Sequence, residues 1–232
     1  TTCLDMAGPL EDILDKVPEY GAGINMAILQ FASPPFTFKN DHPTKSEMEA
    51  LIDKSLDDGA LGVKLLGGHY PLKPDVSSLL IKTALERRAY VAWHAGTSEH
   101  GSNIEGMQEA VAMADGYPLH LAHINAYCRG AIKNELEEVA IAIDLLKKNP
   151  NIFCESYISP KNGTRLTCDE TGKIQSKVTG NCLRKFGFSE DRDGVKKAIL
   201  AGKAFVVYDA GGYSDLMTGE EALKLWEDAD TN

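Results

Sequence analysis

Short apolar runs alternate along this chain with longer segments in which apolar residues recur every three or four positions. Runs such as "NMAILQF" and "YVAWH" are flanked by glycine, proline or polar residues and predict buried strands. The longer segments predict amphipathic helices. Strands are expected within residues 1–8, 23–32, 59–67, 89–96, 118–127, 151–159 and 203–212. Helices are expected within residues 10–17, 44–59, 75–88, 103–116, 130–149, 195–202 and 218–228.

Two of the predicted helices carry start signals. Thr44 and Glu47 have the spacing of a capping box, in which the side chain of each residue binds the backbone of the other. Gly59 is the expected end of that helix. Asp75 is the expected N-cap of the next helix.

The spacing of the strands predicts the architecture. Strands joined by helical crossovers imply a parallel sheet. Equivalent points near the strand ends fall at Cys3, Gln30, Lys64, His94, His123 and Glu155. These points are 27 to 34 residues apart, and a (β/α)8 barrel of ~250 residues averages roughly 31 per unit. We therefore predict an α/β fold of the TIM (β/α)8 barrel type. A flavodoxin-like doubly wound sheet would give the same alternation and stays open as the alternative.

The regular alternation breaks after Glu155. Residues 160–193 are polar, contain several glycines and have no clear period. Such a segment is typical of a lid or a small insertion over a site. The whole chain, 1–232, is expected to belong to one catalytic barrel domain, with residues 160–193 as its lid or insertion.

Composition limits the partners and the compartment. The net charge is −10 and the pI about 5.1, so the surface should repel phosphate backbones and nucleic acid is not expected to bind. No apolar run reaches the ~20 residues that span a bilayer. The five cysteines are odd in number and contain no CxxC pair, which excludes a zinc ribbon or a thioredoxin motif and favours a reducing cytoplasm.

Three polar residues stand at the ends of successive predicted strands. Lys64 lies inside an apolar run, where an ammonium is costly unless it is paired or chemically altered. His94 and His123 close the runs "YVAWH" and "LHLAH". In a barrel these ends meet at the active-site face, and imidazole is the commonest metal ligand. Strand alternation puts His120 and His123 on opposite faces, so we assign only His123 to the site.

The ligand set needs a negative group. Two neutral histidines alone make a weak metal site, and an unmodified lysine supplies no negative charge. A lysine that has reacted with carbon dioxide carries a carboxylate-like head. Lys64 could instead be a structural lysine paired with a carboxylate, and His94 a core histidine with satisfied hydrogen bonds.

Taken together, these motifs resemble the metal-dependent amidohydrolase superfamily, which includes dihydroorotases, hydantoinases and D-aminoacylases. The resemblance lies in the opening "TT", in "GALGVKLLGGHYP" around Lys64, in the two histidine-closed strands and in "NIFCESYISP". It implies that the chain holds barrel strands 2 to 7. The superfamily's His-x-His of strand 1 is absent, and its strand-8 aspartate is not clearly present. The resemblance therefore implies an incomplete barrel, and we expect the chain by itself to bind metal poorly.

The resemblance also implies a reaction and the residues that perform it. One or two divalent ions, most simply zinc, would be held by His94, His123 and carbamylated Lys64. Metal-activated water would attack the amide carbonyl of an N-acyl amino acid, perhaps of the D series, or of a cyclic amide. Asp209 is one candidate for the proton-relaying aspartate, and an aspartate beyond Asn232 is the alternative that we favour. Tyr70, Asn125 and Tyr157 are the candidates for binding the substrate.

Two other functions stay open. A similar barrel could house a divalent-metal lyase or isomerase, or it could be a non-catalytic assembly scaffold. The expected partner is a small-molecule amide. The oligomeric state is not determined by the sequence, and a homo-oligomer is compatible with it.

Overall fold

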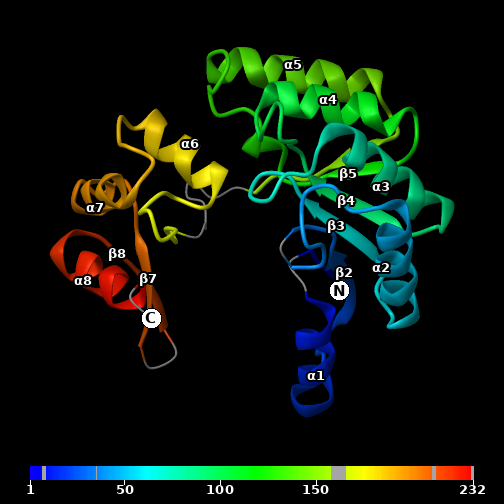
Figure 1. The fold of residues 1–232 in the computed structure, drawn as a ribbon, viewed down its shortest axis with the longest axis horizontal. Coiled ribbons are helices and arrows are strands. Elements are labelled where there is room, and N and C mark those ends of the chain that lie inside the picture. The colour runs from blue at the N-terminus through cyan, green and yellow to red at the C-terminus, as the bar shows by residue number, and fades with distance from the viewer. Residues whose placement is uncertain (7–8, 35, 158–165, 211–212, 231–232) are drawn as a thin grey trace. The chain divides into compact units, whose positions relative to one another are not determined.

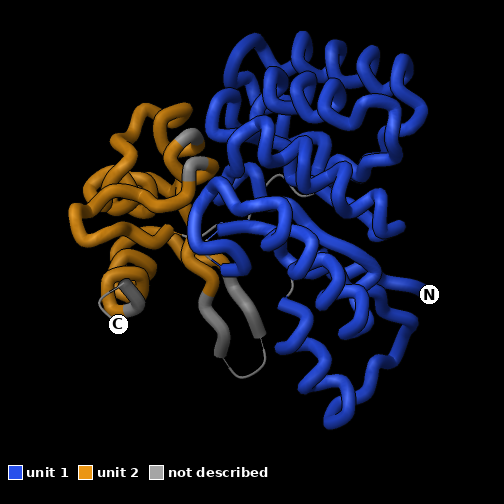
Figure 2. The backbone as a smooth tube through the Cα atoms, turned by 45° about the vertical axis from the view of Figure 1, so that its right-hand side comes forward, with its two compact units in different colours: residues 1–159 blue, residues 160–232 orange. Residues whose placement is uncertain are grey.

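The computed structural model describes residues 1–6, 9–34, 36–157, 166–210 and 213–230. The chain divides into two compact units, residues 1–159 and 160–232 (Figure 2). The boundary falls where the polar segment 160–193 begins. That this segment is a lid over the site stays a prediction.

The first unit contains the predicted strand and helix alternation. Its strands are β1 (Thr2–Asp5), β2 (Asn25–Phe31), β3 (Gly62–Leu66), β4 (Tyr90–His94), β5 (Leu119–Leu121) and β6 (Ile152–Cys154). Its helices are α1 (Leu10–Tyr20), α2 (Lys45–Asp57), α3 (Pro74–Glu86), α4 (Ile104–Ala114), the single-turn η1 (Ile124–Ala126) and α5 (Glu135–Lys148).

These six strands form one parallel sheet in the order β1-β2-β3-β4-β5-β6. The sheet is curled like half of a barrel and is flanked by helices (Figure 1). A doubly wound sheet reverses its strand order at a switch point. The unbroken consecutive order therefore excludes the flavodoxin-like alternative and leaves a partial TIM-like barrel as the architecture of the described strands.

The start signals of two helices gave one correct and one wrong prediction. Thr44 Oγ1 accepts a hydrogen bond from the Glu47 N–H at 3.3 Å, and Glu47 Oε2 accepts one from the Thr44 N–H at 2.8 Å, which confirms the capping box. Asp75 is not the N-cap of α3, because that helix begins one residue earlier at Pro74. Proline suits the first helical position, where its fixed φ is favourable and its missing N–H costs nothing.

The sheet presents different chemistry on its two faces. Val63 and Leu65 on β3 belong to the hydrophobic core that includes Trp93 of β4. Side chains alternate along a strand, and Lys64 is paired in register with Ala92. Lys64 and His94 therefore lie on the face opposite this core. Helices α2 to α4 supply much of the core through Met48, Ile52, Leu80, Ile81, Met107 and Ala110.

Two glycines allow the loops after β3 and β4 to meet backbone against backbone. A Cβ on Gly67 would lie 2.0 Å from the Gly96 carbonyl oxygen, and one on Gly96 would lie 2.7 Å from the Gly67 carbonyl oxygen. Gly96 also has a φ of +147°, which side chains rarely tolerate. These contacts bring the ends of the lysine and histidine strands close together.

The second unit contains helices and a hairpin around its own small core. Its elements are α6 (Lys177–Lys185), α7 (Arg192–Leu200), β7 (Val206–Ala210), β8 (Tyr213–Met217) and α8 (Gly219–Asp230). The predicted strand 203–212 forms as β7, but it pairs antiparallel with β8. The sequence "YSDLM" of β8 is too polar to have been recognised as a strand from apolar runs. The buried core of this unit is Leu183, Val195, Ala198, Ile199, Ala222 and Trp226.

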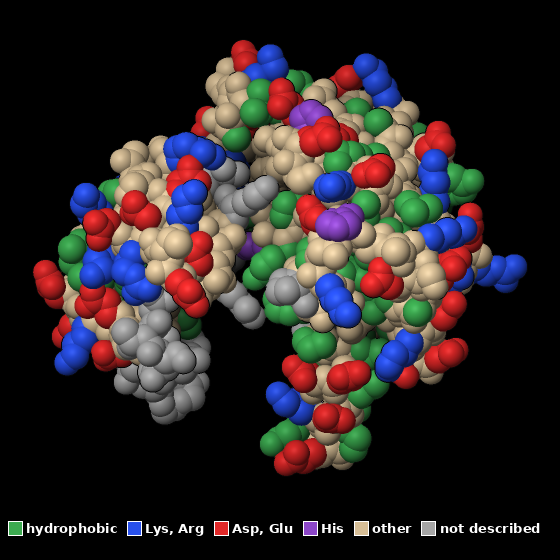
Figure 3. Space-filling view, viewed as in Figure 1, with side chains coloured by type: hydrophobic (Ala, Val, Ile, Leu, Met, Phe, Trp, Pro, Cys, Tyr) green, Lys and Arg blue, Asp and Glu red, His purple; other side chains and the backbone are tan. Residues whose placement is uncertain are grey.

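The distribution of surface charge and the hydropathy of the helices relate to the predictions about binding partners and cellular location. In Figure 3 acidic and basic side chains are interspersed over the visible face of each unit. Within the described ranges, no helix combines the length and the apolar character that crossing a bilayer requires. A cytoplasmic location stays a prediction.

One buried carboxylate holds the loop that precedes α5. Glu138 is fully buried. Its Oε2 accepts a hydrogen bond from the Gly130 N–H at 2.6 Å, and its Oε1 accepts from the N–H groups of Ile132 and Lys133 at 2.8 and 3.0 Å. Glu138 thereby fixes the turn that follows Arg129.

We expect Glu138→Ala to lower the free energy of unfolding by about 2–4 kcal/mol, because three backbone N–H groups would lose a charged acceptor. Chemical denaturation followed by circular dichroism measures this change. Glu137→Ala is the matched control, since Glu137 is exposed on the same helix, and it should change stability by less than about 0.5 kcal/mol. Equal effects of the two substitutions would contradict the anchoring role of Glu138.

Candidate active site

Lys64 is buried in the middle of β3, and the described residues offer it no carboxylate partner. Its side chain is only 2% exposed. Among the described residues, the one hydrogen-bond partner of Nζ is Met6 Sδ at 3.9 Å. Burial lowers the pKa of Lys64 from 10.5 to about 8, although the nearby charge of Glu155 opposes this. The described residues thus offer no ion pair that would make Lys64 a structural lysine.

His94 ends β4 on the same face of the sheet and is 8% exposed. Its Nε2 lies 2.8 Å from Ser102 Oγ. Burial, followed by repulsion from Lys64 and from His123, lowers the pKa of His94 well below the usual value. The imidazole is therefore neutral at physiological pH. If Nε2–H donates to Ser102, Nδ1 keeps its lone pair and has no hydrogen-bond partner in the described structure.

His123 lies beside His94, two residues past the end of β5. The two ring centroids are 5.6 Å apart. His123 Nδ1 lies 2.8 Å from Glu155 Oε1, and the His123 backbone N–H donates to the same oxygen at 2.9 Å. Nε2 makes no hydrogen bond within the described residues. The structure therefore brings together the imidazoles of His94 and His123, and it places Lys64 close enough to affect the pKa of His94.

The expectation that His120 and His123 point to opposite faces is wrong. His120 Nε2 lies 2.5 Å from Glu155 Oε2, so both rings meet the same carboxylate. Alternation applies only to extended backbone, and β5 ends at Leu121. His123 has a φ of 57° in the left-handed region, which turns its side chain back toward the residue it would otherwise oppose.

Glu155 is the residue of this site that sequence reasoning did not recognise as functional. Burial by itself would raise its pKa. The hydrogen bonds from His120, from His123 and from the His123 backbone outweigh that effect and hold the pKa well below its usual range. Glu155 is thus ionised beside two imidazoles. Its position inside the predicted strand 151–159, at a point equivalent to His94 and His123 on their strands, was the available signal.

The three residues predicted to bind substrate have different surroundings. The ring of Tyr70 packs edge-on against Phe36, with centroids 5.1 Å apart. Asn125 Nδ2 donates to the Tyr157 carbonyl at 3.3 Å, and Asn125 Oδ1 is buried without a partner among the described residues. Tyr157 OH accepts a hydrogen bond from Arg129 at 3.2 Å. Arg129 is a further polar group near His94, because its charge contributes to lowering the pKa of that histidine.

Asp209, the candidate for the proton-relaying aspartate, belongs to β7 of the second unit. Its side chain lies outside the part of the chain that the structure describes. Its role stays a prediction.

A second group of possible cation ligands lies after β4. The ligand atoms of Glu99, His100 and Glu109 are all within 4.8 Å of one another, and no other set of three His, Cys, Asp or Glu side chains among the described residues is so close. Glu99 and His100 are exposed. His100 Nδ1 is 3.0 Å from Glu109 Oε1, while Thr97 donates to Glu109 Oε2 at 2.7 Å. This cluster is a competitor for any bound divalent cation.

The donor atoms around Lys64 fit a divalent ion. A metal ligand must be unprotonated and must have a lone pair that is not committed elsewhere. In the described structure Nδ1 of His94 and Nε2 of His123 have no hydrogen-bond partner, and Lys64 Nζ has only the weak sulfur contact. A carbamate on Lys64 would add the anionic oxygen ligand that the two imidazoles lack.

Among the comparisons with known proteins, only those with solved structures give a match, and they show a likeness of fold. The sequence matches no protein-family model and no curated protein. The structure is similar to a chain of the formyltransferase/hydrolase complex from Methylorubrum extorquens in complex with methylofuran, with a TM-score of 0.56, 14% identity, and coverage of 94% of this chain and 43% of that chain. A Xaa-Pro dipeptidase with bound methionine in the active site aligns with a TM-score of 0.42, 18% identity, and coverage of 65% of this chain and 40% of that chain. The chain spans less than half the length of both.

Replacing Lys64 by methionine should stabilise the metal-free protein. One pKa unit corresponds to about 1.4 kcal/mol, so a folded-state pKa of about 8 instead of 10.5 costs about 3 kcal/mol. The cost is fully present below pH 8. It disappears as the pH rises toward 10.5, because the folded state then binds fewer protons than the unfolded state. We expect Lys64→Met to raise the free energy of unfolding by about 1–3 kcal/mol at pH 7 and by less at pH 10.

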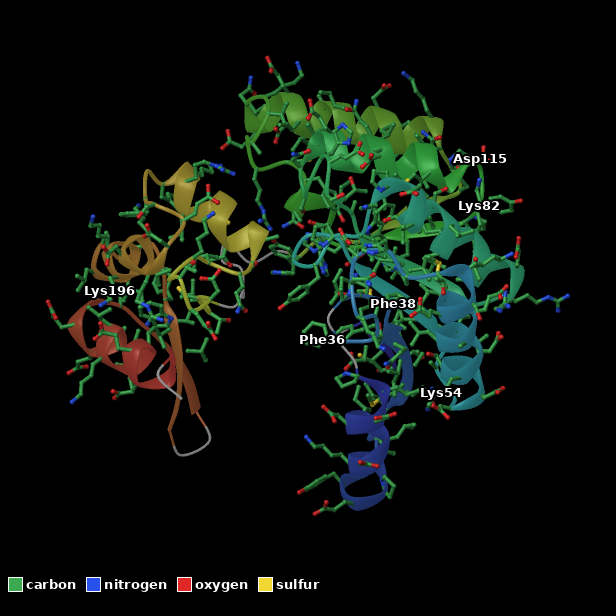
Figure 4. The ribbon with its side chains drawn as sticks, in the orientation of Figure 1. Phe36, Phe38, Lys54, Lys82, Asp115 and Lys196 are labelled. Atoms are coloured by element: carbon green, nitrogen blue, oxygen red, sulfur yellow. The ribbon has the colours of Figure 1, made fainter. Side chains whose placement is uncertain are left out.

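Urea denaturation at several pH values in carbon dioxide-depleted buffer measures this difference. Lys82→Met is the matched control, because Lys82 lies at the surface beside Asp115 (Figure 4), with Nζ 3.7 Å from Asp115 Oδ2. The control should change stability by less than about 1 kcal/mol. A Lys64→Met protein that is less stable than the wild type at pH 7 would show that the ammonium has a stabilising partner.

Proposed function

We propose that this chain forms the catalytic centre of a metal-dependent hydrolase that cleaves amide C–N bonds. The observation that carries the proposal is the combination of a buried lysine, for which the described residues offer no carboxylate partner, and two imidazoles that each keep one nitrogen without a hydrogen bond in the described structure. These three groups belong to neighbouring parallel strands: Lys64 lies in the middle of β3, His94 ends β4 and His123 follows β5. The active site of such a half-barrel is expected at the C-terminal ends of its strands.

In this proposal His94 Nδ1 and His123 Nε2 hold one divalent ion, with zinc as the first candidate, since imidazole suits that metal. Lys64 acts as a carbamate, formed when its neutral amine adds to carbon dioxide and loses a proton. The pKa of about 8 leaves a usable fraction of neutral amine near physiological pH. The bound ion would supply Lewis acidity for an amide carbonyl and would lower the pKa of a water molecule.

The remaining polar groups would bind and orient the substrate. Asn125 Oδ1 is a buried acceptor that lacks a donor, so an amide N–H of the substrate would satisfy it. Tyr157 and Arg129 lie next to it and offer donors to a carbonyl or a carboxylate. Tyr70, beyond the end of β3, is the candidate donor to the developing oxyanion. An N-acyl amino acid matches these groups, and a cyclic amide is the other substrate class.

The fold likeness to a chain of a formyltransferase/hydrolase complex supports a hydrolase at the level of architecture. A lyase or isomerase with one divalent ion could use the same ligands. A non-catalytic scaffold would have no use for an unpaired buried amine, because an apolar residue at position 64 would be more stable there.

The incomplete ligand set of this chain predicts weak zinc binding, and we expect the zinc that does bind to depend on His94 and His123. His94→Ala and His123→Ala should each weaken zinc binding by at least about tenfold, since each removes a ligand from a site with few ligands. Competition with a chromophoric chelator measures the affinity. Hydrolysis of N-acyl D- and L-amino acids and of cyclic amides should fall in the same variants.

His100→Ala is the control for this experiment, because it disrupts the cluster with Glu99 and Glu109 and leaves His94 and His123 intact. It should not change zinc affinity. Loss of zinc in His100→Ala but not in His94→Ala would place the ion in that cluster and would contradict the proposal.

A carbamate on Lys64 can be detected directly by ¹³C NMR. In buffer with ¹³C-labelled bicarbonate we expect one carbamate carbon resonance in the wild-type protein, because the neutral amine of Lys64 is an available nucleophile. Lys64→Met should abolish that resonance, and Lys82→Met should keep it. A resonance that persists in Lys64→Met would assign the carbamate to another amine.

A further inference from the structure

Glu155 contacts two histidines, and its hydrogen bonds require the proton on a different ring nitrogen in each of them. We propose that Glu155 is a positioning residue that fixes His123 as the Nδ1–H tautomer and keeps its Nε2 free. In this proposal the Tyr90–His120 pair holds Glu155 in place, and both ring nitrogens of His120 are occupied by hydrogen bonds. The consequence for metal binding rests on the proposed function. The tautomers themselves do not depend on it.

The argument begins with the two oxygens of Glu155. Oε1 receives the His123 backbone N–H at 2.9 Å and lies 2.8 Å from His123 Nδ1. A carboxylate is an acceptor only, so Nδ1 must carry the proton. The neutral form of imidazole carries one proton, so in that form Nε2 of His123 is the nitrogen with the lone pair.

His120 has the opposite arrangement. Its Nε2 lies 2.5 Å from Glu155 Oε2, which requires the proton on Nε2. Its Nδ1 then accepts a hydrogen bond from Tyr90 OH at 2.9 Å. Both ring nitrogens of His120 are occupied, so His120 would have to break one of these bonds to become a ligand.

The backbone explains why His123 needs a support. The residue lies past the last ladder pair of β5, which joins Leu121 to Cys154, and its φ is 57°. The sheet therefore does not hold its side chain. Glu155 contacts both its main chain and its ring, which defines the ring orientation as well as the protonated nitrogen. A histidine ligand commonly donates its second N–H to such a carboxylate, which orients the ring.

The wild-type protein provides the first test. ¹⁵N NMR of the histidine side chains, without metal and at pH 7.5, should assign His123 as the Nδ1–H tautomer and His120 as the Nε2–H tautomer. The measurement needs no substitution and no activity. A wild-type His123 that is protonated on Nε2 would overturn the proposal.

Two substitutions at Glu155 provide the second test. Glu155→Ala should shift His123 toward the Nε2–H tautomer, which free imidazole side chains favour, and should weaken zinc binding about 10- to 100-fold. Glu155→Gln should largely preserve the Nδ1–H tautomer, because the amide oxygen still accepts, and should weaken zinc binding less. Dispersed backbone amide spectra establish that each variant is folded. An unchanged His123 tautomer in folded Glu155→Ala would overturn the proposal.

Glu109→Gln is the matched control, because Glu109 also pairs with the Nδ1 of a histidine, His100, in the same unit. It should affect only the His100 signals. If His123 is the Nδ1–H tautomer but the protein binds no metal, the proposed function fails and the positioning role stands. If zinc binds through His94 and His123 with equal affinity in wild type and Glu155→Ala, the positioning role fails and the proposed function stands.

Discussion

The burial of the Lys64 amine is the constraint on which the site depends. Burial disfavours the charged form of each base and lowers the pKa values of both Lys64 and His94. The charge of Lys64 lowers the pKa of His94 further, because it repels the protonated imidazole. His94 is therefore neutral at physiological pH, and a fraction of Lys64 is neutral as well. Glu155 responds in the opposite sense, because the hydrogen bonds that it accepts stabilise its charge. A neutral imidazole, a partly neutral amine and one anion thus lie near one another, and this combination suits a cation.

The surrounding fold makes this arrangement possible. The core on the helix side of the sheet supplies apolar burial, and it leaves the opposite face to polar groups. Gly67 and Gly96 let the loops after β3 and β4 touch. Glu138 fixes the turn after Arg129. Each feature stabilises a backbone segment next to the site, which offsets part of the cost of the buried amine.

The two histidines of "LHLAH" illustrate how hydrogen bonding divides similar side chains into different roles. Both contact Glu155, yet their bonds require protons on different nitrogens. His120 is saturated by Tyr90 and Glu155, and His123 keeps one nitrogen open. A ligand role for His123 and a supporting role for His120 follow from this difference in protonation and hydrogen bonding, and strand alternation does not predict it.

Much of the architecture was determined by the sequence, because apolar periodicity is local and helical crossovers oblige the strands to run parallel. The same reasoning placed Lys64, His94 and His123 near one end of the sheet. The strand order, the meeting of His120 with Glu155, and the contact of His94 with Ser102 were decided by tertiary structure alone. The pairs that meet in the site come from different strands and loops, and their contacts depend on the register of the sheet. The left-handed turn at His123 also depends on where β5 ends, and no apolar pattern specifies that point. Physical proximity across the sheet, which a linear pattern does not contain, turned separate polar residues into a site.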